Sequence, residues 1–242
     1  MTPVPHLVSA ALLLGMVALK ASRWLLPSEV DTINQGSPFV LPTRSLIGLG
    51  VVAFCVFLGE GAMADWSAIY LSRTLETGAG IASAGYAVFS LAMAVCRLIG
   101  DRLTQSLGPV RMVRFGGIMA AIGMGLSLLI AQPVAALIGF ACVGVGFSCI
   151  VPLVFSAAGR TPGIAPSMAL AAVTTTGYFG FLFGPPLIGF AAELLTLRGA
   201  LGIVVLLSAT IAVLAQTVGC ATGSFEEGSP NEKISPPSMK MW

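Results

Sequence analysis

Charged side chains are scarce in this sequence. Only 9% of its 242 residues are Asp, Glu, Lys or Arg, whereas 56% are hydrophobic and the mean hydropathy is +0.95. A soluble domain usually carries about 25% charged residues, so a chain with so few cannot build a surface that faces only water. Lipid is the medium that fits this composition, and the sequence predicts an all-α membrane protein.

Histidine, patterned cysteine and basic patches are also lacking. His6 is the only histidine. The five cysteines all lie in or at the ends of apolar stretches: Cys55, Cys96, Cys142, Cys149 and Cys220. Their spacing fits neither a disulfide framework nor a zinc site, and small buried side chains are the simpler interpretation. No aromatic-interleaved basic patch points to nucleic acid. With no nucleophile–base arrangement or phosphate-binding loop either, we expect no enzyme activity, no cofactor and no metal.

What the sequence does have is long apolar stretches. A helix that rises 1.5 Å per residue needs about 20 residues to cross the hydrocarbon of a bilayer, where its backbone must satisfy its own hydrogen bonds. Six clear spans are predicted, at Ser45–Tyr70, Ile81–Gly100, Arg111–Ala131, Val134–Ser156, Ser167–Ala191 and Gly199–Gly219. An earlier segment within residues 1–26 is interrupted by Lys20 and Arg23 and is either a first span or part of one. The total is about seven transmembrane helices.

The polar segments divide the chain and orient it. Residues 27–44 are rich in Pro, Gly, Ser and Asn and are predicted to be a linker, residues 45–220 the six-helix bundle, and residues 221–242 a disordered tail. Lys and Arg outside the spans gather on the side of the linker and tail, which should therefore be cytoplasmic. An odd number of spans would place the N-terminus outside, so we expect the chain to start partway through a longer helical pattern. The cytoplasmic set is Lys20, Arg23, Arg44, Arg102, Arg111, Arg114, Arg160, Lys233 and Lys240, against Arg73 and Arg198 outside.

Two carboxylates stand out in the first clear span. Glu60 lies about 22 Å along the helix, inside the hydrocarbon, where a charge facing lipid is costly and so should face the bundle interior. It is either a proton-titrating or substrate-binding group, or a protonated packing residue. Asp65 lies about 30 Å along, near Trp66 and Tyr70, and is either part of the same pathway or an interfacial neighbour of these aromatics. The two carboxylates are about 140° apart around the helix, so they do not share one face.

A charged cluster closes the second clear span. Arg97 and Asp101 are four residues apart and could pair on one helix face. Arg102 follows directly, and Arg111 and Arg114 come after a short loop. The cluster is either plain positive-inside anchoring or a charge latch that holds one conformation of a moving bundle.

The fifth clear span combines small residues with helix breakers. Gly180 and Gly184 are spaced to let another helix approach closely. Pro185 and Pro186 each remove a backbone donor and are expected to bend the helix. Tyr178, beside two glycines, is the candidate of this span for lining a cavity.

Three motifs in this order resemble the major facilitator superfamily. They are the run Gly59–Ser67, the run Arg97–Leu103, and the run from Gly177 to Gly189 with its Gly-Pro-Pro. The resemblance covers about residues 7–220, and is to the bacterial branch of fucose-permease-like and MosC-like proteins. It implies twelve helices in two halves, of which the six clear spans are similar to the C-terminal six-helix bundle and the first segment to the end of the sixth helix.

The resemblance also implies a function. Asp101 and Arg102 match the family's cytoplasmic loop signature, whereas Cys96, Pro109 and Val110 depart from it. The implied protein is a secondary transporter of a bacterial inner membrane, which moves a small polar solute, with a sugar-like compound as one candidate, by symport and alternating access. Its expected partners are the solute, the lipid bilayer and a missing N-terminal helical half. The alternative is a truncated or accessory membrane protein without transport activity of its own.

Overall fold

The computed structural model describes residues 12–17, 19, 20 and 44–223. The chain divides into two units, residues 1–40 and 41–242, which we treat separately. In the first unit, residues 12–17, 19 and 20 are helical and their side chains are exposed. The rest of the predicted first segment, the linker up to residue 43 and the tail beyond Gly223 lie outside the described residues.

The second unit is built from helices alone in the part of the chain that is described. In order they are α2 (Arg44–Ile69) with its π-helical last turn η3 (Tyr70–Thr74), α3 (Ala79–Leu107), α4 (Pro109–Ile130), α5 (Pro133–Phe147), α6 (Ile150–Gly159), α7 (Pro166–Leu194), α8 (Leu197–Leu214) and α9 (Gln216–Gly223).

These helices form six stretches long and apolar enough to cross a membrane, which confirms the predicted fold class. They run over Arg44–Thr74, Ala79–Leu107, Pro109–Ile130, Pro133–Gly159, Pro166–Leu194 and Leu197–Cys220. The largest difference from the predicted ends is in the second span, which continues past Gly100 to Leu107 and so carries Asp101 and Arg102 on the helix.

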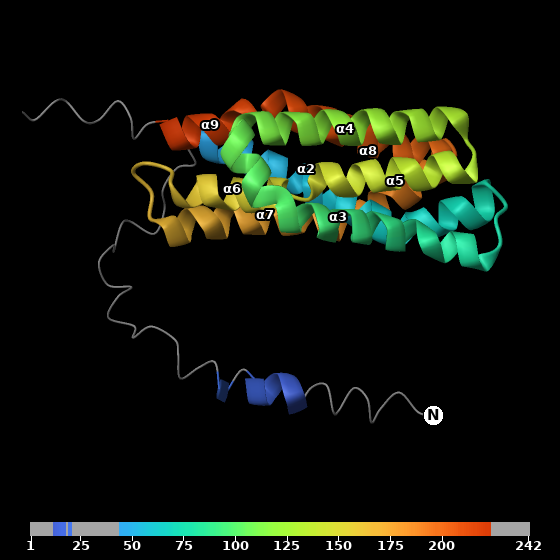
Figure 1. The fold of residues 1–242 in the computed structure, drawn as a ribbon, viewed down its shortest axis with the longest axis horizontal. Coiled ribbons are helices and arrows are strands. Elements are labelled where there is room, and N and C mark those ends of the chain that lie inside the picture. Colours follow the sequence, from blue (N-terminus) through green and yellow to red (C-terminus); the bar gives the residue numbers. More distant parts are fainter. Residues whose placement is uncertain (1–11, 18, 21–43, 224–242) are drawn as a thin grey trace, which may run out of the picture. The chain divides into compact units, whose positions relative to one another are not determined.

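The helices run back and forth along the length of the bundle, with α2 in its interior (Figure 1). In the most apolar window of α2 78% of the residues are buried, and the helix is contacted by α3, α6, α7, α8 and α9. The stretch formed by α5 and α6 is 61% buried by the same measure, whereas α3 and α7 are only 28% buried each. The first and fourth spans therefore form the centre, and α3 and α7 leave apolar faces uncovered.

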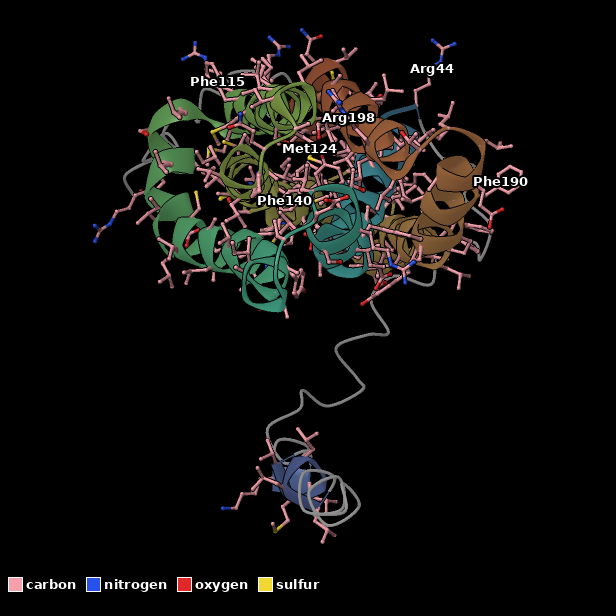
Figure 2. All side chains as sticks on the ribbon, turned by 90° about the vertical axis from the view of Figure 1, so that its right-hand side faces the viewer. Arg44, Phe115, Met124, Phe140, Phe190 and Arg198 are labelled. Carbon is pink, nitrogen blue, oxygen red and sulfur yellow. The ribbon has the colours of Figure 1, made fainter. Side chains whose placement is uncertain are left out.

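The outward side chains are apolar where a soluble protein would be charged. Phe115 on α4 and Phe190 on α7 point away from the bundle, and are 57% and 63% exposed, whereas Met124 and Phe140 point inward and are fully buried (Figure 2). Lipid is a solvent in which such faces carry no penalty, because its chains are as apolar as the side chains themselves.

The fourth span is not the single helix that the sequence predicted. It breaks at Ser148 and Cys149, between the end of α5 and the start of α6. Pro152 explains the break, because proline has no N–H to donate to the carbonyl four residues earlier, that of Ser148. The next bond of the ladder is present, since Leu153 N–H donates to the Cys149 carbonyl at 3.2 Å. The Ser148 carbonyl is thus left free for a donor from elsewhere.

Glycines let neighbouring helices pack with their backbones in close contact. Gly144 of α5 lies directly against the backbone of α3, where an added Cβ would overlap the Phe89 carbonyl oxygen and sit 3.2 Å from Met93 N. One helical turn further on, α5 reaches Ser148 and α3 reaches Arg97. This close contact therefore brings Arg97 and Ser148 to the same level.

The fifth span packs on the first through its small residues. A Cβ on Gly180 would lie 2.9 Å from Leu58 N, and one on Gly184 would lie 3.3 Å from the Leu58 carbonyl oxygen, both in α2. Pro185 and Pro186 lie inside α7, which continues through them as one helix to Leu194.

Candidate functional site

Glu60 of α2 and Arg97 of α3 face each other inside the bundle. The Glu60 Oε1 atom lies 3.8 Å from Arg97 Nη2, and the two side chains are 16% and 47% exposed. Theirs is the one ion pair within the described residues. The sequence had assigned Glu60 to a solute pathway and Arg97 to a cytoplasmic latch with Asp101. The structure joins Arg97 to Glu60, and Asp101 is exposed with no ion-pair partner among the described residues.

Arg97 has a second partner at the break in the fourth span. Its Nε donates a hydrogen bond to the Ser148 carbonyl oxygen at 2.9 Å, the group left free by Pro152. The hydroxyl of Ser148 turns back and donates to the Val145 carbonyl at 2.7 Å. One guanidinium thus links the two central spans, α2 and α5–α6, through α3.

A cavity of about 430 Å³ opens beside this pair. Glu60, Tyr86, Ser90 and Arg97 are its polar lining residues. Its apolar walls come from Ala64, Phe89, Met93, Ala94 and Phe181. The volume is in the range of sites for small organic ligands, which combine mostly apolar walls with a few convergent polar groups.

Several polar atoms of this cavity have hydrogen-bonding capacity to spare. Glu60 Oε1 and Ser90 Oγ are buried, and neither has a hydrogen-bond partner in the described chain. Buried polar groups are nearly always satisfied, so each unsatisfied one needs an explanation. Of the nitrogens of Arg97, only Nε makes a hydrogen bond to a described residue. A carboxylate, a hydroxyl and the terminal nitrogens of a guanidinium thus line one cavity, and a rotation of the Glu60 and Ser90 side chains would bring their buried oxygens to its surface.

The other two predicted pathway residues lie outside this cavity. Asp65 is exposed and does not line it. Tyr178 is 61% exposed. It is separated from the cavity by Phe57, whose ring centroid lies 5.6 Å from that of Tyr178. Phe57 in turn stacks on Phe181, a wall of the cavity, at 5.0 Å. Tyr178 is thus linked to the wall of the cavity through Phe57.

The predicted gating-loop residues other than Arg97 lie at one end of the bundle. Asp101 and Arg102 are on the last turns of α3, Arg111 and Arg114 on the first turns of α4, and all four are exposed. Gly108 joins the two helices with φ of 80°, a conformation that costs glycine little and other residues much.

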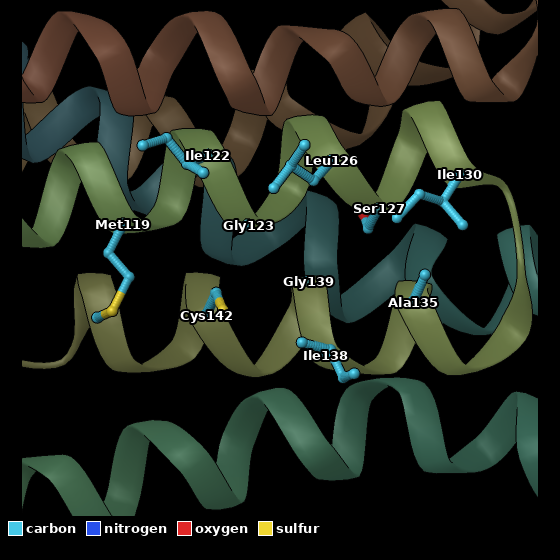
Figure 3. A pocket seen from close by; sticks show the side chains of 10 residues that line it. All are labelled: Met119, Ile122, Gly123, Leu126, Ser127, Ile130, Ala135, Ile138, Gly139 and Cys142. Carbon is cyan, nitrogen blue, oxygen red and sulfur yellow. The ribbon is translucent and has the colours of Figure 1, made fainter.

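A second cavity, of about 410 Å³, lies between α4 and α5 (Figure 3). Its lining residues are Met119, Ile122, Gly123, Leu126, Ser127, Ile130, Ala135, Ile138, Gly139 and Cys142. None is charged, and the one hydroxyl, on Ser127, donates to the Met124 carbonyl at 2.8 Å. This cavity has no group to orient a polar solute. The described residues also contain no group of three or more His, Cys, Asp or Glu that could hold a metal ion.

The sequence reasoning missed the residues that complete the site. Ser90 and Tyr86 carry no signal, because a hydroxyl in an apolar helix is common and usually bonds to its own backbone. Ser148 was detectable, since Pro152 inside an apolar span marks a carbonyl without its helical donor.

Comparison with known proteins relates the chain to the major facilitator superfamily. The family model described as Major Facilitator Superfamily matches residues 49–233. An uncharacterised MFS-type transporter of Yersinia pestis is 38% identical over 218 residues, which are 90% of this chain and 56% of the relative. The membrane protein MosC of Rhizobium meliloti is 32% identical over 86% of this chain and 52% of its own length. An uncharacterised transporter of Sinorhizobium fredii is 37% identical over 78% and 50%. The chain spans about half the length of these curated relatives.

Proposed function

The chain belongs to the major facilitator superfamily and is a multi-pass membrane protein, and from this membership we propose that it forms one helical half of a secondary transporter for a small polar solute. The observation that carries the proposal is the Glu60–Arg97 cavity. A carboxylate and a guanidinium inside an apolar bundle are costly and mark a pathway or a binding site in membrane proteins. Here both face a cavity large enough for a solute.

The other half would cover the faces that this chain leaves open. The relatives are about twice as long as the matched region, and α3 and α7 are the least buried of the six spans. Both helices contribute walls to the cavity, Phe89 from α3 and Phe181 from α7. A second bundle placed against them would close the cavity on its open side, and rocking of the two bundles would give alternating access.

We assign the remaining predicted residues supporting roles in this cycle. Asp101, Arg102, Arg111 and Arg114 would act at the cytoplasmic end as a gating loop, without Arg97 as an intrahelical partner of Asp101. Asp65 would lie near the outer mouth of the pathway.

The fifth span, α7, would support the wall of the cavity and the movement of the helices. Tyr178 would support the aromatic wall through Phe57, and Gly180 and Gly184 would let α7 slide against α2. Pro185 and Pro186 would allow α7 to bend during the cycle.

The transport would be proton-coupled symport, with Glu60 as the titrating group, in the inner membrane of a bacterium. The resemblance to fucose-permease-like proteins makes a sugar-like compound one candidate solute. A carboxylate with a spare acceptor atom beside a guanidinium could hydrogen-bond hydroxyl groups.

A second candidate function is that of a truncated or accessory membrane protein that does not transport. The half-length match to each relative is compatible with this alternative as well as with the first. The two functions differ in what happens when the other half is supplied.

Uptake into proteoliposomes separates them. The chain is reconstituted alone, and together with the unmatched remainder of the Yersinia relative, and a panel of radiolabelled sugars and amino acids is offered under an inward proton gradient. The proposal predicts uptake of at least one solute above empty vesicles by the combined halves. Failure of every solute, with or without the gradient, would favour the non-transporting alternative.

A further inference from the structure

We propose that the Glu60–Arg97 cavity binds a small zwitterionic solute, whose carboxylate pairs with Arg97, whose ammonium group pairs with Glu60, and whose body is apolar. The inference rests on the proposed function in so far as the bound molecule would be the transported one. Its evidence is the charge, the polar atoms and the walls of the cavity itself.

The charge of the cavity selects against ions of one sign. Glu60 and Arg97 are its only ionisable residues apart from Tyr86, and as an ion pair they sum to zero. A monoanion that takes Arg97 would leave Glu60 unpaired, and a monocation that takes Glu60 would leave Arg97 unpaired. Leaving one of these charges without its partner is unfavourable, because the site is largely apolar. A zwitterion instead replaces one ion pair by two, and leaves neither Glu60 nor Arg97 without an opposite charge.

The existing ion pair is loose enough to be exchanged. Its two atoms are 3.8 Å apart, whereas a charge-assisted hydrogen bond is about 2.7–2.9 Å long. Glu60 Oε1 also has no other hydrogen-bond partner in the described chain. Both charges can therefore gain shorter contacts by accepting a solute between them, in place of a contact that is already long.

Arg97 is held in a position to receive a carboxylate. Its Nε donates to the Ser148 carbonyl. The N–H groups of the two terminal nitrogens make no hydrogen bond to a described residue and are therefore available to a ligand. A guanidinium presents donors in a planar fork that matches both oxygens of a carboxylate. The helix break caused by Pro152 thus has a role, which is to supply the carbonyl that orients this fork.

The walls favour an apolar body over a polyhydroxylated one. Five of the nine lining residues are Ala64, Phe89, Met93, Ala94 and Phe181. On this chain, a sugar with its ring of hydroxyls would meet Ser90 and Tyr86 as the described polar partners besides the charged pair. Hydroxyls placed against the apolar walls would lose water without gaining a hydrogen bond. An aliphatic or aromatic side chain fits these walls. The solute class that meets all of these conditions is a neutral amino acid with an apolar side chain.

Binding can be tested on this chain in detergent with probes that differ by one charge. The thermal unfolding midpoint is measured with leucine and phenylalanine, with 4-methylpentanoate, which is leucine without its ammonium, with 3-methylbutylamine, which is leucine without its carboxylate, and with glucose. A ligand at ten times its dissociation constant should raise the midpoint by about 3–5 °C. We expect this rise with at least one of the amino acids, and a shift of less than about 1 °C with the singly charged analogues and the sugar.

Variants locate the effect. Glu60→Gln and Arg97→Gln should each abolish the rise. The matched controls Glu193→Gln and Arg73→Gln, which change exposed residues away from the cavity, should retain it. An equal or larger rise with either singly charged analogue or with glucose would overturn the proposal, as would no rise with either amino acid, or a rise that survives both cavity variants. Binding without uptake would leave this inference standing while the transport proposal fails, and uptake of a different solute would do the reverse.

Discussion

At the scale of single residues, the central feature of the site is one guanidinium with two partners. Arg97 contacts the Glu60 carboxylate and donates to the Ser148 carbonyl, and so joins an acidic side chain on one helix to a backbone group on another. Removing one member of a partly buried pair leaves the other charged and without its partner, which costs more than the pair itself contributes. The two charges should therefore behave as a unit.

The first prediction is a coupling between these two charges. Glu60→Gln and Arg97→Gln should each lower the free energy of unfolding in detergent by about 1–2 kcal/mol, because each strands the other charge. The double variant should lose less than the sum of the two, since neither charge is then left unpaired. Thermal or denaturant unfolding of the four proteins measures this, and strictly additive losses would show that the pair does not interact.

Part of this site was within reach of the sequence. Glu60 could be identified because a carboxylate in an apolar span has few tolerable positions. Its partner could not, because Asp101 on the same helix was an equally plausible partner for Arg97 and only the packing of α3 against α2 and α5 decides between them. Ser90 shows the other limit, since its hydroxyl gains meaning only from the cavity that it lines.

At the scale of the elements, the broken fourth span is what fixes Arg97. Pro152 withholds a donor from Ser148, and Gly144 lets the backbone of α3 approach until Arg97 reaches that carbonyl. Neither residue touches the ion pair through its own side chain. Both act by setting where a backbone lies.

The second prediction concerns the break. Pro152→Ala supplies the missing N–H, so the Ser148 carbonyl should bond within the helix and release Arg97. Amide hydrogen exchange should slow in the segment from Ser148 to Val154, while the response to leucine weakens. Pro186→Ala is the matched control, since it should change exchange in α7 alone. Unchanged exchange around Ser148 in the Pro152→Ala variant would contradict this account of the break.

The third prediction concerns the contact between α3 and α5. Gly144→Ala places a methyl group on the Phe89 carbonyl and should lower the thermal midpoint, because the backbones must separate. Gly202→Ala is the matched control, since nothing lies within 4 Å of its Cβ position. It should be neutral or stabilising, by up to about 1 kcal/mol, because alanine favours helix over glycine. Equal effects of the two substitutions would show that the approach at Gly144 is not tight.

The helices themselves were predictable because length and apolarity decide them in lipid. All six clear spans are present, and their ends moved by a few residues where polar side chains continue a helix beyond the hydrocarbon, as Asp101 and Arg102 do on α3. Apolarity does not mark the break at Ser148, because it continues across it without interruption; the signal for the break is Pro152.

At the scale of the whole molecule, charge and packing give the bundle a direction and an open side. Arg44, Arg102, Arg111 and Arg160 belong to one end of the alternating helices, and Arg198 to the other, where it donates to the Leu129 carbonyl at 3.0 Å. The positive-inside bias predicts that the first end is cytoplasmic.

The fourth prediction is this orientation in cells. In a background without reactive native cysteines, Gly163→Cys, in the loop between α6 and α7, should react with a membrane-impermeant maleimide only after permeabilisation. Gly78→Cys, before α3 at the opposite end, should react in intact cells. The reverse pattern would invert the topology, and with it the assignment of the gating loop to the cytoplasm.

The most direct measurement of the central claim, that solute passes through the Glu60–Arg97 cavity, is uptake by variants of the reconstituted two-half transporter. The account predicts that Glu60→Gln and Arg97→Gln each reduce the initial rate by about tenfold or more, as expected when a pair worth at least about 1.4 kcal/mol to the bound state is lost. Glu193→Gln and Arg73→Gln should transport at the unmodified rate. Uptake at that rate by both cavity variants would contradict the claim.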